Sequence, residues 1–398
     1  MKIIITGVSG FVGKNIVPLL ECSGVELLLV GRNPHNIQKL FPMHRAVSYD
    51  DLKNETQKFD SIVHLAVLNN NSSKSLNEFR KINVHFLESL IEVAKTLEIR
   101  TFINLTTIHT IKSGNLSHYA LTKMEGEQVL SKAKGITVIN LRLPAIYGTT
   151  YAGKLSILLK FPKFVRPFVF QILTSIKPAV KAKLVVKALI EASNGNIKSD
   201  LILTDRQLDN KFYNITKRVL DLTFVFFTIT LLWWLLILVW LLVKLSSPGP
   251  GIFAQKRVGK NAELFTCYKF RTMKLNTKIV GTHEVNPSNI TSVGKFLRKT
   301  KIDELPQLLN ILKNEMSLVG PRPCLPSQTD LISARRSLGV FEVVGGITGW
   351  AQIKNIDMRD PYRLSEIDAE YQSLRTIPLD LKIILATAFG RGQGDKIK

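Results

Sequence analysis

The sequence predicts an α/β chain in three parts: a doubly wound parallel sheet, a long apolar helix and a small mixed α/β region. Short apolar strands alternate with helical stretches as far as residue 205, which is typical of a parallel sheet. Residues 222–243 carry no charged side chain, and a chain of 398 residues is too long for one typical domain. We therefore expect two domains, 1–205 and 206–398, with a membrane helix at 219–243.

Charge and cysteine content limit the partners and the compartment. The formal net charge of +23 favours anionic partners such as phosphates or an acidic membrane surface. The basic residues cluster near the apolar run and near phosphate-type motifs, and no reader motif is present, so we expect no nucleic-acid binding. The three cysteines have no metal or disulfide spacing and no secretory signal is visible, which suits a reducing cytoplasm.

The first strand and its turn predict a nucleotide site. Residues 2–6 read as a buried strand, and a helical stretch follows a turn that contains three glycines. Because Gly7, Gly10 and Gly13 have no Cβ atom, the backbone there can approach a pyrophosphate at a helix N-terminus. Such a turn alone often binds nothing. Four further strands in the expected order support a Rossmann-type sheet: 25–33, 59–67, 100–110 and 135–148.

The helix after the fourth strand carries a candidate catalytic pair. Tyr119 and Lys123 lie on one face of this helix, so the ammonium can lower the pKa of the phenol. Thr107, at the end of the fourth strand, can hydrogen-bond the same substrate oxygen. This spacing alone usually marks a solvated helix face, but its position after a glycine turn and four strands favours catalysis.

With these motifs in this order, residues 1–205 resemble the extended short-chain dehydrogenases/reductases that act on nucleotide sugars. The resemblance rests on Asn83 and on the motifs TGVSGFVG, HLA, LTT, YALTK and LRLPAIYG. It implies a bound nicotinamide cofactor, for which Lys123 is also a ligand, and a catalytic set of Thr107, Tyr119 and Lys123. The stretch between Thr107 and Tyr119 is short, and the segment after Gly148, where this family builds its sugar pocket, is abbreviated.

The end of the second strand bears on the choice of cofactor. NAD sites usually place an acid there to hold the ribose hydroxyls, whereas this chain has Gly31-Arg32-Asn33. A guanidinium suits a 2′-phosphate, so we prefer NADP to NAD, and with it a reductase to an epimerase. The alternative is that Arg32 only covers the adenine.

Two adjacent carboxylates carry the chemistry expected of the C-terminal region. Asp303 and Glu304 precede a helical stretch, beside unsatisfied amides that favour anions. Cations surround them in the sequence, at Arg298, Lys299, Lys301 and Arg322. This composition suits phosphoryl transfer, in which cations mask phosphate charge while an aspartate attacks. An Asp-Glu pair alone is more often a helix cap.

Residues 217–398 resemble the bacterial sugar transferases, the monotopic phosphoglycosyl transferases that begin the assembly of surface polysaccharides and glycoconjugates. The motifs are KRVLD, SPGPGIFAQKRVGK, YKFRTM, LRKTKIDELPQLLNILKNEMSLVGPRP, GITGWAQ and LDLKIILAT. The resemblance implies that Asp303 attacks the β-phosphate of a UDP-sugar, that UMP leaves, and that polyprenyl phosphate accepts the phosphosugar. It implies that Glu304 helps to hold Mg²⁺, and that four cations bind phosphates or the nucleotide: Lys269, Arg271, Arg298 and Arg322.

The apolar run is long enough to cross a bilayer, since a helix over residues 219–243 spans about 37 Å against a hydrocarbon core of about 30 Å. However, UDP-sugars and nicotinamide cofactors are cytoplasmic, and basic residues flank both ends of the run, which fits no single orientation. We therefore predict a re-entrant hairpin in the bacterial inner membrane, with both domains facing the cytoplasm. The family's Ser-Pro breaker is absent, so the bend would depend on Thr228, Thr230, Trp233 and Trp234.

A second segment also suits a membrane surface. Residues 154–187 combine many Lys and Arg residues with several aromatics and no acid. This composition is typical of the headgroup region of an acidic leaflet, or equally of a helix with a solvated basic face.

Together these predictions describe a bifunctional membrane enzyme. It would reduce a 4-keto nucleotide sugar with NADPH, with UDP-N-acetyl-6-deoxyhexosamine as the first choice, and would transfer the phosphosugar to undecaprenyl phosphate. Three alternatives stay open for the N-terminal domain: an NAD-dependent 4-epimerase, an enzyme acting on the lipid-linked sugar, or a non-catalytic nucleotide-binding module. Formation of a homo-oligomer is also left open.

Overall fold

The computed structural model describes residues 1–68, 72–111, 117–197, 199–275, 277 and 287–392. The chain separates into two compact units. The N-terminal unit contains Met1–Phe170 and Lys177–Asp205, and the C-terminal unit contains Gln171–Ile176 and Arg206–Lys398.

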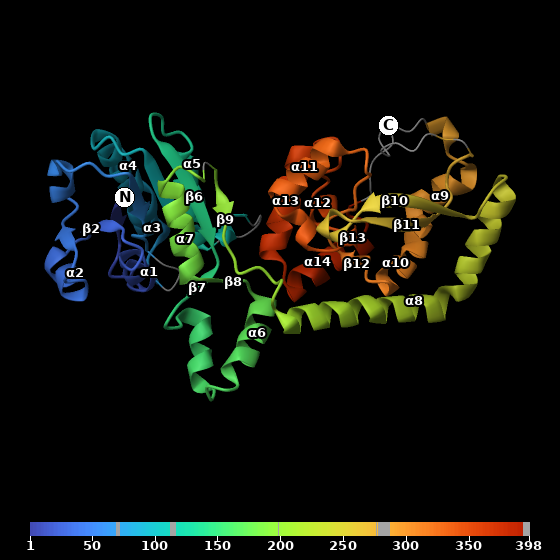
Figure 1. Cartoon of the computed structure of the whole chain (residues 1–398), viewed down its shortest axis with the longest axis horizontal. Coiled ribbons are helices and arrows are strands. Elements are labelled where there is room, and N and C mark those ends of the chain that lie inside the picture. Colours follow the sequence, from blue (N-terminus) through green and yellow to red (C-terminus); the bar gives the residue numbers. More distant parts are fainter. Residues whose placement is uncertain (69–71, 112–116, 198, 276, 278–286, 393–398) are drawn as a thin grey trace. The chain divides into compact units, whose positions relative to one another are not determined.

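A seven-stranded parallel sheet lies at the centre of the N-terminal unit (Figure 1), in the order β3-β2-β1-β4-β5-β6-β9. The strands are β1 (Lys2–Thr6), β2 (Glu26–Val30), β3 (Arg45–Val47), β4 (Ser61–His64), β5 (Thr101–Thr107), β6 (Thr137–Leu143) and β9 (Leu201–Ile202). The order reverses between β1 and β4, and in doubly wound sheets ligands bind at the carboxyl ends of strands at that point. The predicted fold class is confirmed for this unit.

Helices cover both faces of the sheet because successive strand residues point to opposite sides. Ile3 and Ile5 pack with residues of α1 and α7, whereas Ile4 packs on the other face with residues of α4 and α5. The helices of this unit are α1 (Phe11–Glu21), α2 (Pro34–Leu40), α3 (Leu76–Arg80), α4 (Phe86–Thr96), α5 (His118–Leu130) and α7 (Ala182–Ser193), with short turns at Asp51–Asn54, Lys81–His85 and Ile108–Ile111.

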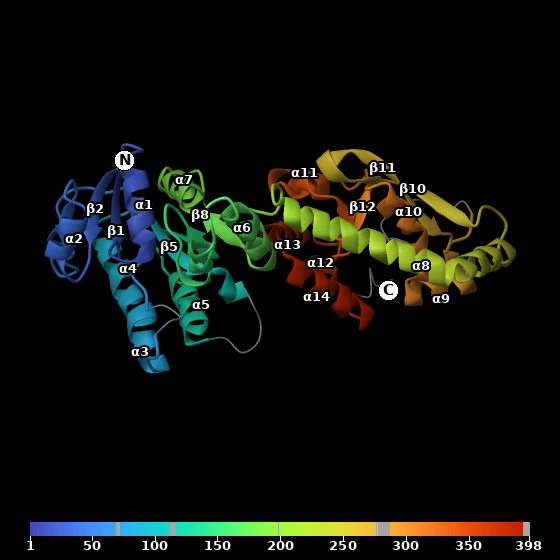
Figure 2. The same cartoon turned by 90° about the horizontal axis from the view of Figure 1, so that it is seen from below.

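A small annex adjoins the main sheet. Strands β7 (Ala145–Tyr147) and β8 (Ala179–Lys181) pair in parallel, and two helices lie between them in the chain, η4 (Gly153–Lys160) and α6 (Arg166–Ile176). Figures 1 and 2 show η4 and α6 as a helical hairpin. The hairpin follows Gly148, where the sequence already showed an abbreviated segment.

Helix α8 (Lys211–Ser246) has 36 residues, and its axis turns along its course (Figure 1). It extends beyond the predicted range of 219–243, and its first turns pack on the C-terminal unit through Tyr213, which is buried. Within the apolar run, the Thr230 hydroxyl bonds to the Phe226 carbonyl, and Trp234 Nε1 donates to the Leu231 carbonyl at 3.0 Å. Side chains that bond to helix carbonyls in this way favour bending.

Both ends of α8 pack on the same unit. Near its start, Tyr213 donates to Asp380 at 2.7 Å, and Asp221 accepts bonds from the Ser317 hydroxyl and the Leu318 amide at 3.0 and 2.9 Å. Near its end, Val239 and Val243 are buried with Phe270 and Leu297. Aromatic side chains between these ends are exposed, namely Phe226, Phe227, Trp233 and Trp234.

The remainder of the C-terminal unit is mixed α/β. Strands β10 (Ile252–Val258) and β11 (Leu264–Phe270) form an antiparallel pair, and β12 (Met316–Val319) pairs in parallel with β13 (Gly345–Thr348). The helices and short turns are Lys260–Ala262, Pro287–Asn289, α9 (Ser292–Thr300), η8 (Ile302–Gln307), α10 (Leu308–Leu312), α11 (Thr329–Ser337), Val340–Glu342, α12 (Trp350–Ile353), α13 (Pro361–Leu374) and α14 (Ile377–Ala388). The predicted mixed α/β region is confirmed.

Candidate active sites

The turn between β1 and α1 is too crowded for side chains at two of the three predicted glycines. Gly7 has φ +72°, and a Cβ there would lie 2.4 Å from the Ala66 backbone nitrogen. A Cβ at Gly13 would lie 2.2 Å from the Val8 carbonyl oxygen. Gly10 N-caps α1, and its surface stays open. The turn therefore fits the pyrophosphate of a nicotinamide dinucleotide, as the sequence predicts.

Arg32 follows β2 and is exposed. Burial raises the pKa of Tyr49, while the Arg32 charge and the Gly7 backbone both oppose that rise. Tyr49 therefore links Arg32 to the glycine turn. This position suits contact with the adenosine part of a dinucleotide.

Tyr119 and Lys123 lie on α5, as predicted, but their electrostatics differ from the prediction. Burial raises the pKa of Tyr119 to about 12 and lowers the pKa of Lys123 to about 8. Lys123 Nζ donates to the Leu105 carbonyl at 2.8 Å. Burial is the only contribution to this shift of the Tyr119 pKa, so the predicted lowering of the phenol pKa by Lys123 is not seen. Thr107 is buried at the end of β5 and accepts a bond from the His109 amide at 3.3 Å.

Polar contacts not predicted from the sequence hold α5 against the sheet. Glu127 accepts bonds from the Thr106 hydroxyl at 2.8 Å and from Arg142 at 2.6 Å. Asn83, whose motif position was noted, donates to the Thr122 hydroxyl at 3.1 Å. These bonds fix the helix that carries Tyr119.

In the C-terminal unit, η8 carries both candidate carboxylates. Lys301 adopts a left-handed conformation (φ 58°) between α9 and η8, so the chain turns immediately before Asp303. Lys269, on β11, donates to Glu304 Oε1 at 2.6 Å, and Arg322 donates to the same oxygen at 3.2 Å. Strand, turn and loop thus bring together residues that are distant in the sequence.

The two carboxylates differ in protonation. Burial and the neighbouring Glu304 raise the pKa of Asp303, although Lys269, Arg298 and Arg322 oppose the rise. Burial also acts to raise the pKa of Glu304, but Lys269 and Arg322 outweigh it and lower that pKa well below its ordinary value. Glu304 is therefore a fixed anion held by cations, whereas Asp303 is the carboxylate with higher proton affinity.

Of the predicted phosphate ligands, Arg298 lies near Asp303, whereas Arg271 is bonded to backbone carbonyls elsewhere. Arg298 Nε donates to the Thr272 hydroxyl at 2.9 Å, and the Arg298 charge acts on Asp303. Arg271 is buried, and its guanidinium donates to the carbonyls of Ser247 and Pro248 at 2.7 and 2.6 Å. The prediction that Arg271 binds phosphate is corrected: β11 ends at Phe270, and Arg271 instead secures the chain just after α8.

The carboxylate pair fits a magnesium ion shared with a substrate. Among the described residues, no group of three or more Asp, Glu, His or Cys side chains is arranged to hold a metal. Mg²⁺ is usually bound through only one or two carboxylates together with substrate phosphates and water. Glu304 would supply such a carboxylate, with Lys269 and Arg322 already on its Oε1, and the adjacent Asp303 would stay available as the nucleophile.

A pocket of about 410 Å³ adjoins this site and was not predicted from the sequence. Arg322 lines it together with residues of the segment 349–368, among them Gln352, Asn355 and Arg359. Buried Arg335 donates to the Arg322 carbonyl at 2.8 Å and pairs with Asp368 at 2.6 Å. Arg335 therefore positions the loop that carries Arg322 between Glu304 and the pocket.

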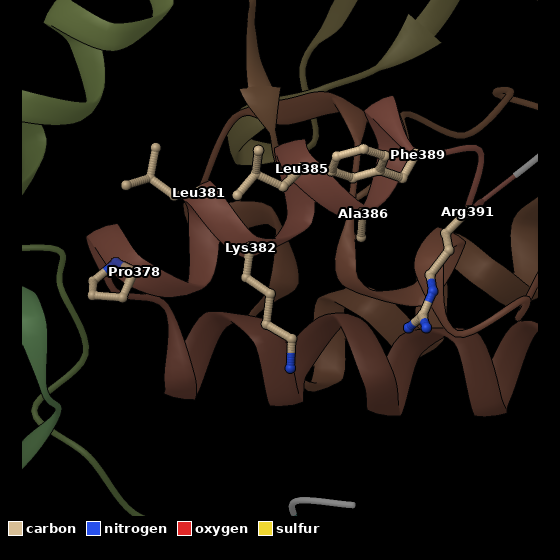
Figure 3. Close-up of a pocket in the computed structure, with 7 residues that line it drawn as sticks. All are labelled: Pro378, Leu381, Lys382, Leu385, Ala386, Phe389 and Arg391. Carbon is tan, nitrogen blue, oxygen red and sulfur yellow. The ribbon is translucent and has the colours of Figure 1, made fainter.

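Helix α14 borders an apolar hollow of about 560 Å³ (Figure 3). Leu381, Leu385 and Phe389 are exposed along it, with Lys382 and Arg391 beside them. An apolar hollow with flanking cations suits an anionic lipid better than a sugar nucleotide.

Comparison with known proteins finds a matching family model for each half of the chain. Residues 212–392 match the family model for bacterial sugar transferases, and residues 3–188 match that of the NAD dependent epimerase/dehydratase family. The chain is 38% identical over 173 residues to an uncharacterized sugar transferase of Bacillus subtilis, a match covering 44% of this chain and 85% of that protein. It is 37% identical to a UDP-glucose:undecaprenyl-phosphate glucose-1-phosphate transferase of Caulobacter vibrioides, over 44% of this chain and 68% of that protein.

Other matches cover less of the related protein or have lower identity. The chain spans half or less of the length of three further curated relatives, including the UDP-glucose:undecaprenyl-phosphate glucose-1-phosphate transferase of Escherichia coli. Among solved structures, a UDP-N-acetylglucosamine 4-epimerase from Bacillus cereus is 21% identical, with a TM-score of 0.41 over 51% of this chain and 78% of that chain.

Proposed function

The chain belongs to the bacterial sugar transferase family, and from this premise we propose that it transfers a phosphosugar from a UDP-sugar to undecaprenyl phosphate. The observation that carries this proposal is that two adjacent buried carboxylates differ in their proton affinity. Glu304 is ionised and forms ion pairs with Lys269 and Arg322, whereas Asp303 has a raised pKa beside the same cations. A nucleophile surrounded by cations that can mask phosphate charge suits this transfer.

The proposed reaction has two displacements. In the first, an Asp303 oxygen bonds to the β-phosphorus of the UDP-sugar, the bond from that phosphorus to the bridging oxygen breaks, and UMP leaves with the electron pair. In the second, an oxygen of undecaprenyl phosphate attacks the same phosphorus and releases the Asp303 carboxylate. Lys269, Arg298 and Arg322 would hold the phosphate oxygens, and the 410 Å³ pocket beside Arg322 would take the nucleoside. Bound Mg²⁺ would mask phosphate charge at Glu304.

For the N-terminal unit we propose reduction of a 4-keto nucleotide sugar with NADPH. Tyr119 is protonated at neutral pH because burial raises its pKa to about 12, so it can donate to the oxygen of a ketone. The bound cofactor would supply the hydride. A 4-epimerase would instead begin by removing a hydroxyl proton from its substrate. We prefer the reductase because Arg32 suits the 2′-phosphate of NADPH, a cofactor that a reductase consumes.

We further propose that α8 enters the cytoplasmic leaflet and returns. Its start, at Tyr213 and Asp221, and its end, at Val239 and Val243, pack on one compact unit. A crossing would place these ends on opposite sides of the bilayer and break one set of contacts. Both units would then work on the cytoplasmic side, where UDP-sugars and nicotinamide cofactors are found.

The transferase proposal is tested with the full chain in membranes and a panel of radiolabelled UDP-sugars. Label should enter lipid for one sugar class. Asp303→Asn should reduce the rate of this transfer by at least about a thousandfold. Asp330→Asn is the matched control, since Asp330 lies at the start of α11 and outside the carboxylate site. Transfer that survives in Asp303→Asn would disprove the assignment of the nucleophile.

The reductase proposal is tested by NADPH consumption with Tyr119→Phe as the inactive control. Oxidation with a UDP-4-keto sugar supports the proposal. Oxidation only with the lipid-linked keto sugar places the reduction after transfer. Interconversion of 4-epimers without net NADPH consumption indicates an epimerase, and binding without turnover indicates a nucleotide-binding module.

A further inference from the structure

The hairpin of η4 and α6 (Figure 1) has exposed apolar side chains near its tip, the turn that joins its two helices. Leu159 is 55% exposed and Phe164 is 85% exposed, whereas Leu155 and Leu158 are buried on the inner side of η4. The turn between them is well defined: Arg166 Nε donates to the Phe161 carbonyl at 2.9 Å. This turn keeps the Phe164 side chain exposed. Exposed apolar groups of this kind often mark a site that binds a membrane or another protein.

The tip is surrounded by positive charge. Lys154, Lys160 and Lys163 are exposed on the hairpin, and the sequence has no Asp or Glu between residues 128 and 190. Lysine is depleted at protein–protein interfaces. Lysines around an apolar tip instead suit an anionic leaflet, where the apolar groups enter the headgroup boundary and the ammonium groups meet phosphates.

The hairpin is also attached close to the proposed membrane helix. Asn210, the N-cap of α8, donates to the Gln171 carbonyl at 2.9 Å and to the Thr174 hydroxyl at 3.1 Å. The last turns of α6 are therefore bound to the residues that begin α8.

We propose that this tip is a second membrane anchor, which inserts Phe164 and Leu159 into an anionic phospholipid leaflet. The proposal rests on the membrane attachment of α8 but not on either catalytic activity. It gives the N-terminal unit its own contact with the lipid surface, in the segment where a nucleotide-sugar pocket is abbreviated.

The test uses the full chain in lipid nanodiscs, with Cys22→Ser to remove the exposed native thiol. Phe164→Cys carries an environment-sensitive fluorophore, and nanodiscs contain phosphatidylglycerol with phosphatidylcholine, or phosphatidylcholine alone. We expect a blue-shifted emission that nitroxide-labelled lipid quenches in the anionic nanodiscs. A label at Met43→Cys, which is 82% exposed in the same unit, should stay in water and be quenched by iodide.

Charge reversal at Lys160 and Lys163 tests the role of the lipid charge. Each lysine near an anionic surface increases membrane affinity by about fivefold. Lys160→Glu with Lys163→Glu should therefore reduce the ratio of inserted to free tip by at least about thirtyfold. Lys132→Glu with Lys134→Glu, in the same acid-free stretch but outside the hairpin, should leave quenching unchanged. A label at Leu159→Cys repeats the test if the Phe164 variant does not fold.

Two outcomes would overturn the proposal. Quenching of the tip label by iodide in every lipid would show that the tip stays in water. Protection from iodide without quenching by labelled lipid would show that protein, such as a second copy of the chain, covers it.

Discussion

At the scale of single residues, Asp303 gives the transferase a distinct pH dependence. Its pKa is raised by burial and by Glu304, and the nucleophile must be ionised to attack. Transfer should therefore fall as the pH drops through a value above the ordinary aspartate pKa of about 4. The measurement is the rate of single-turnover release of UMP between pH 4 and 9. A rate that stays constant down to pH 4 would contradict the raised pKa.

The raised pKa of Asp303 also predicts that stability changes with pH in the direction opposite to activity. Because the folded-state pKa of Asp303 is raised, the folded protein binds this proton more readily than the unfolded chain, so the group destabilises the fold above its folded pKa. Asp303→Asn should therefore raise Tm at pH 8 by about 2–4 °C, corresponding to roughly 1 kcal/mol. The gain should disappear near pH 4, where wild-type Asp303 is protonated. An equal gain at both pH values would mean that the carboxylate charge is not its cause.

Arg271 should prove to be structural. Its buried guanidinium bonds to the carbonyls of Ser247 and Pro248, so Arg271→Ala should leave them unsatisfied and cost about 3 kcal/mol. Thermal unfolding in nanodiscs measures this loss, with exposed Lys260→Ala as the control. The KM for the UDP-sugar should change little in the folded fraction. A large increase in KM without loss of stability would restore the phosphate-binding prediction.

The sequence predicted which residue types form the candidate C-terminal site but not all of the contacts between them. Lys269 and Arg271 are two positions apart, and alternation along a strand predicts that they share a face. That rule fails because β11 ends at Phe270. The ion pairs of Glu304 with Lys269 and Arg322 join three separate segments, which no local pattern encodes.

At the scale of elements, α8 shows what an apolar run can and cannot predict. The apolar run predicted this helix, but the helix starts earlier because residues of its first turns bond to the rest of the unit, as Tyr213 does with Asp380. Without proline, the position of a bend depends on side-chain bonds to carbonyls. The predicted role of Thr230 in such a bond is seen, at the Phe226 carbonyl.

The bend in α8 predicts a short distance between its ends. Spin labels at Ile215 and Leu245, both well exposed, would lie about 45 Å apart along a straight helix. In the bent helix the distance should be clearly shorter, as measured by double electron–electron resonance on the full chain in nanodiscs. Labels at Ile215 and Trp234 serve as the control for the first part of the helix. A distance near 45 Å would rule out the bend.

At the scale of the whole molecule, the sequence predicted two α/β regions, and each of them matches a known family model. It did not predict the pocket beside Arg322. That pocket forms where Arg335 and Asp368, two helices apart, fix the loop of Arg322 against residues 349–368. Patterns in sequence report local periodicity, whereas this pocket exists only after α11 and α13 have packed.

The re-entrant course that we propose for α8 predicts that both of its ends face the cytoplasm. Ile215→Cys and Leu245→Cys, each in a Cys22→Ser background, are exposed positions on the two arms. A membrane-impermeant maleimide added to intact cells should label neither, and permeabilised cells should show labelling of both, because the two arms pack on one unit that cannot lie on both sides of a bilayer. An introduced cysteine in a known external loop of another membrane protein checks the reagent. If one of the two positions is labelled from outside while the other is protected, α8 crosses the membrane, and the packing of Val239 and Val243 against Phe270 cannot persist in the cell.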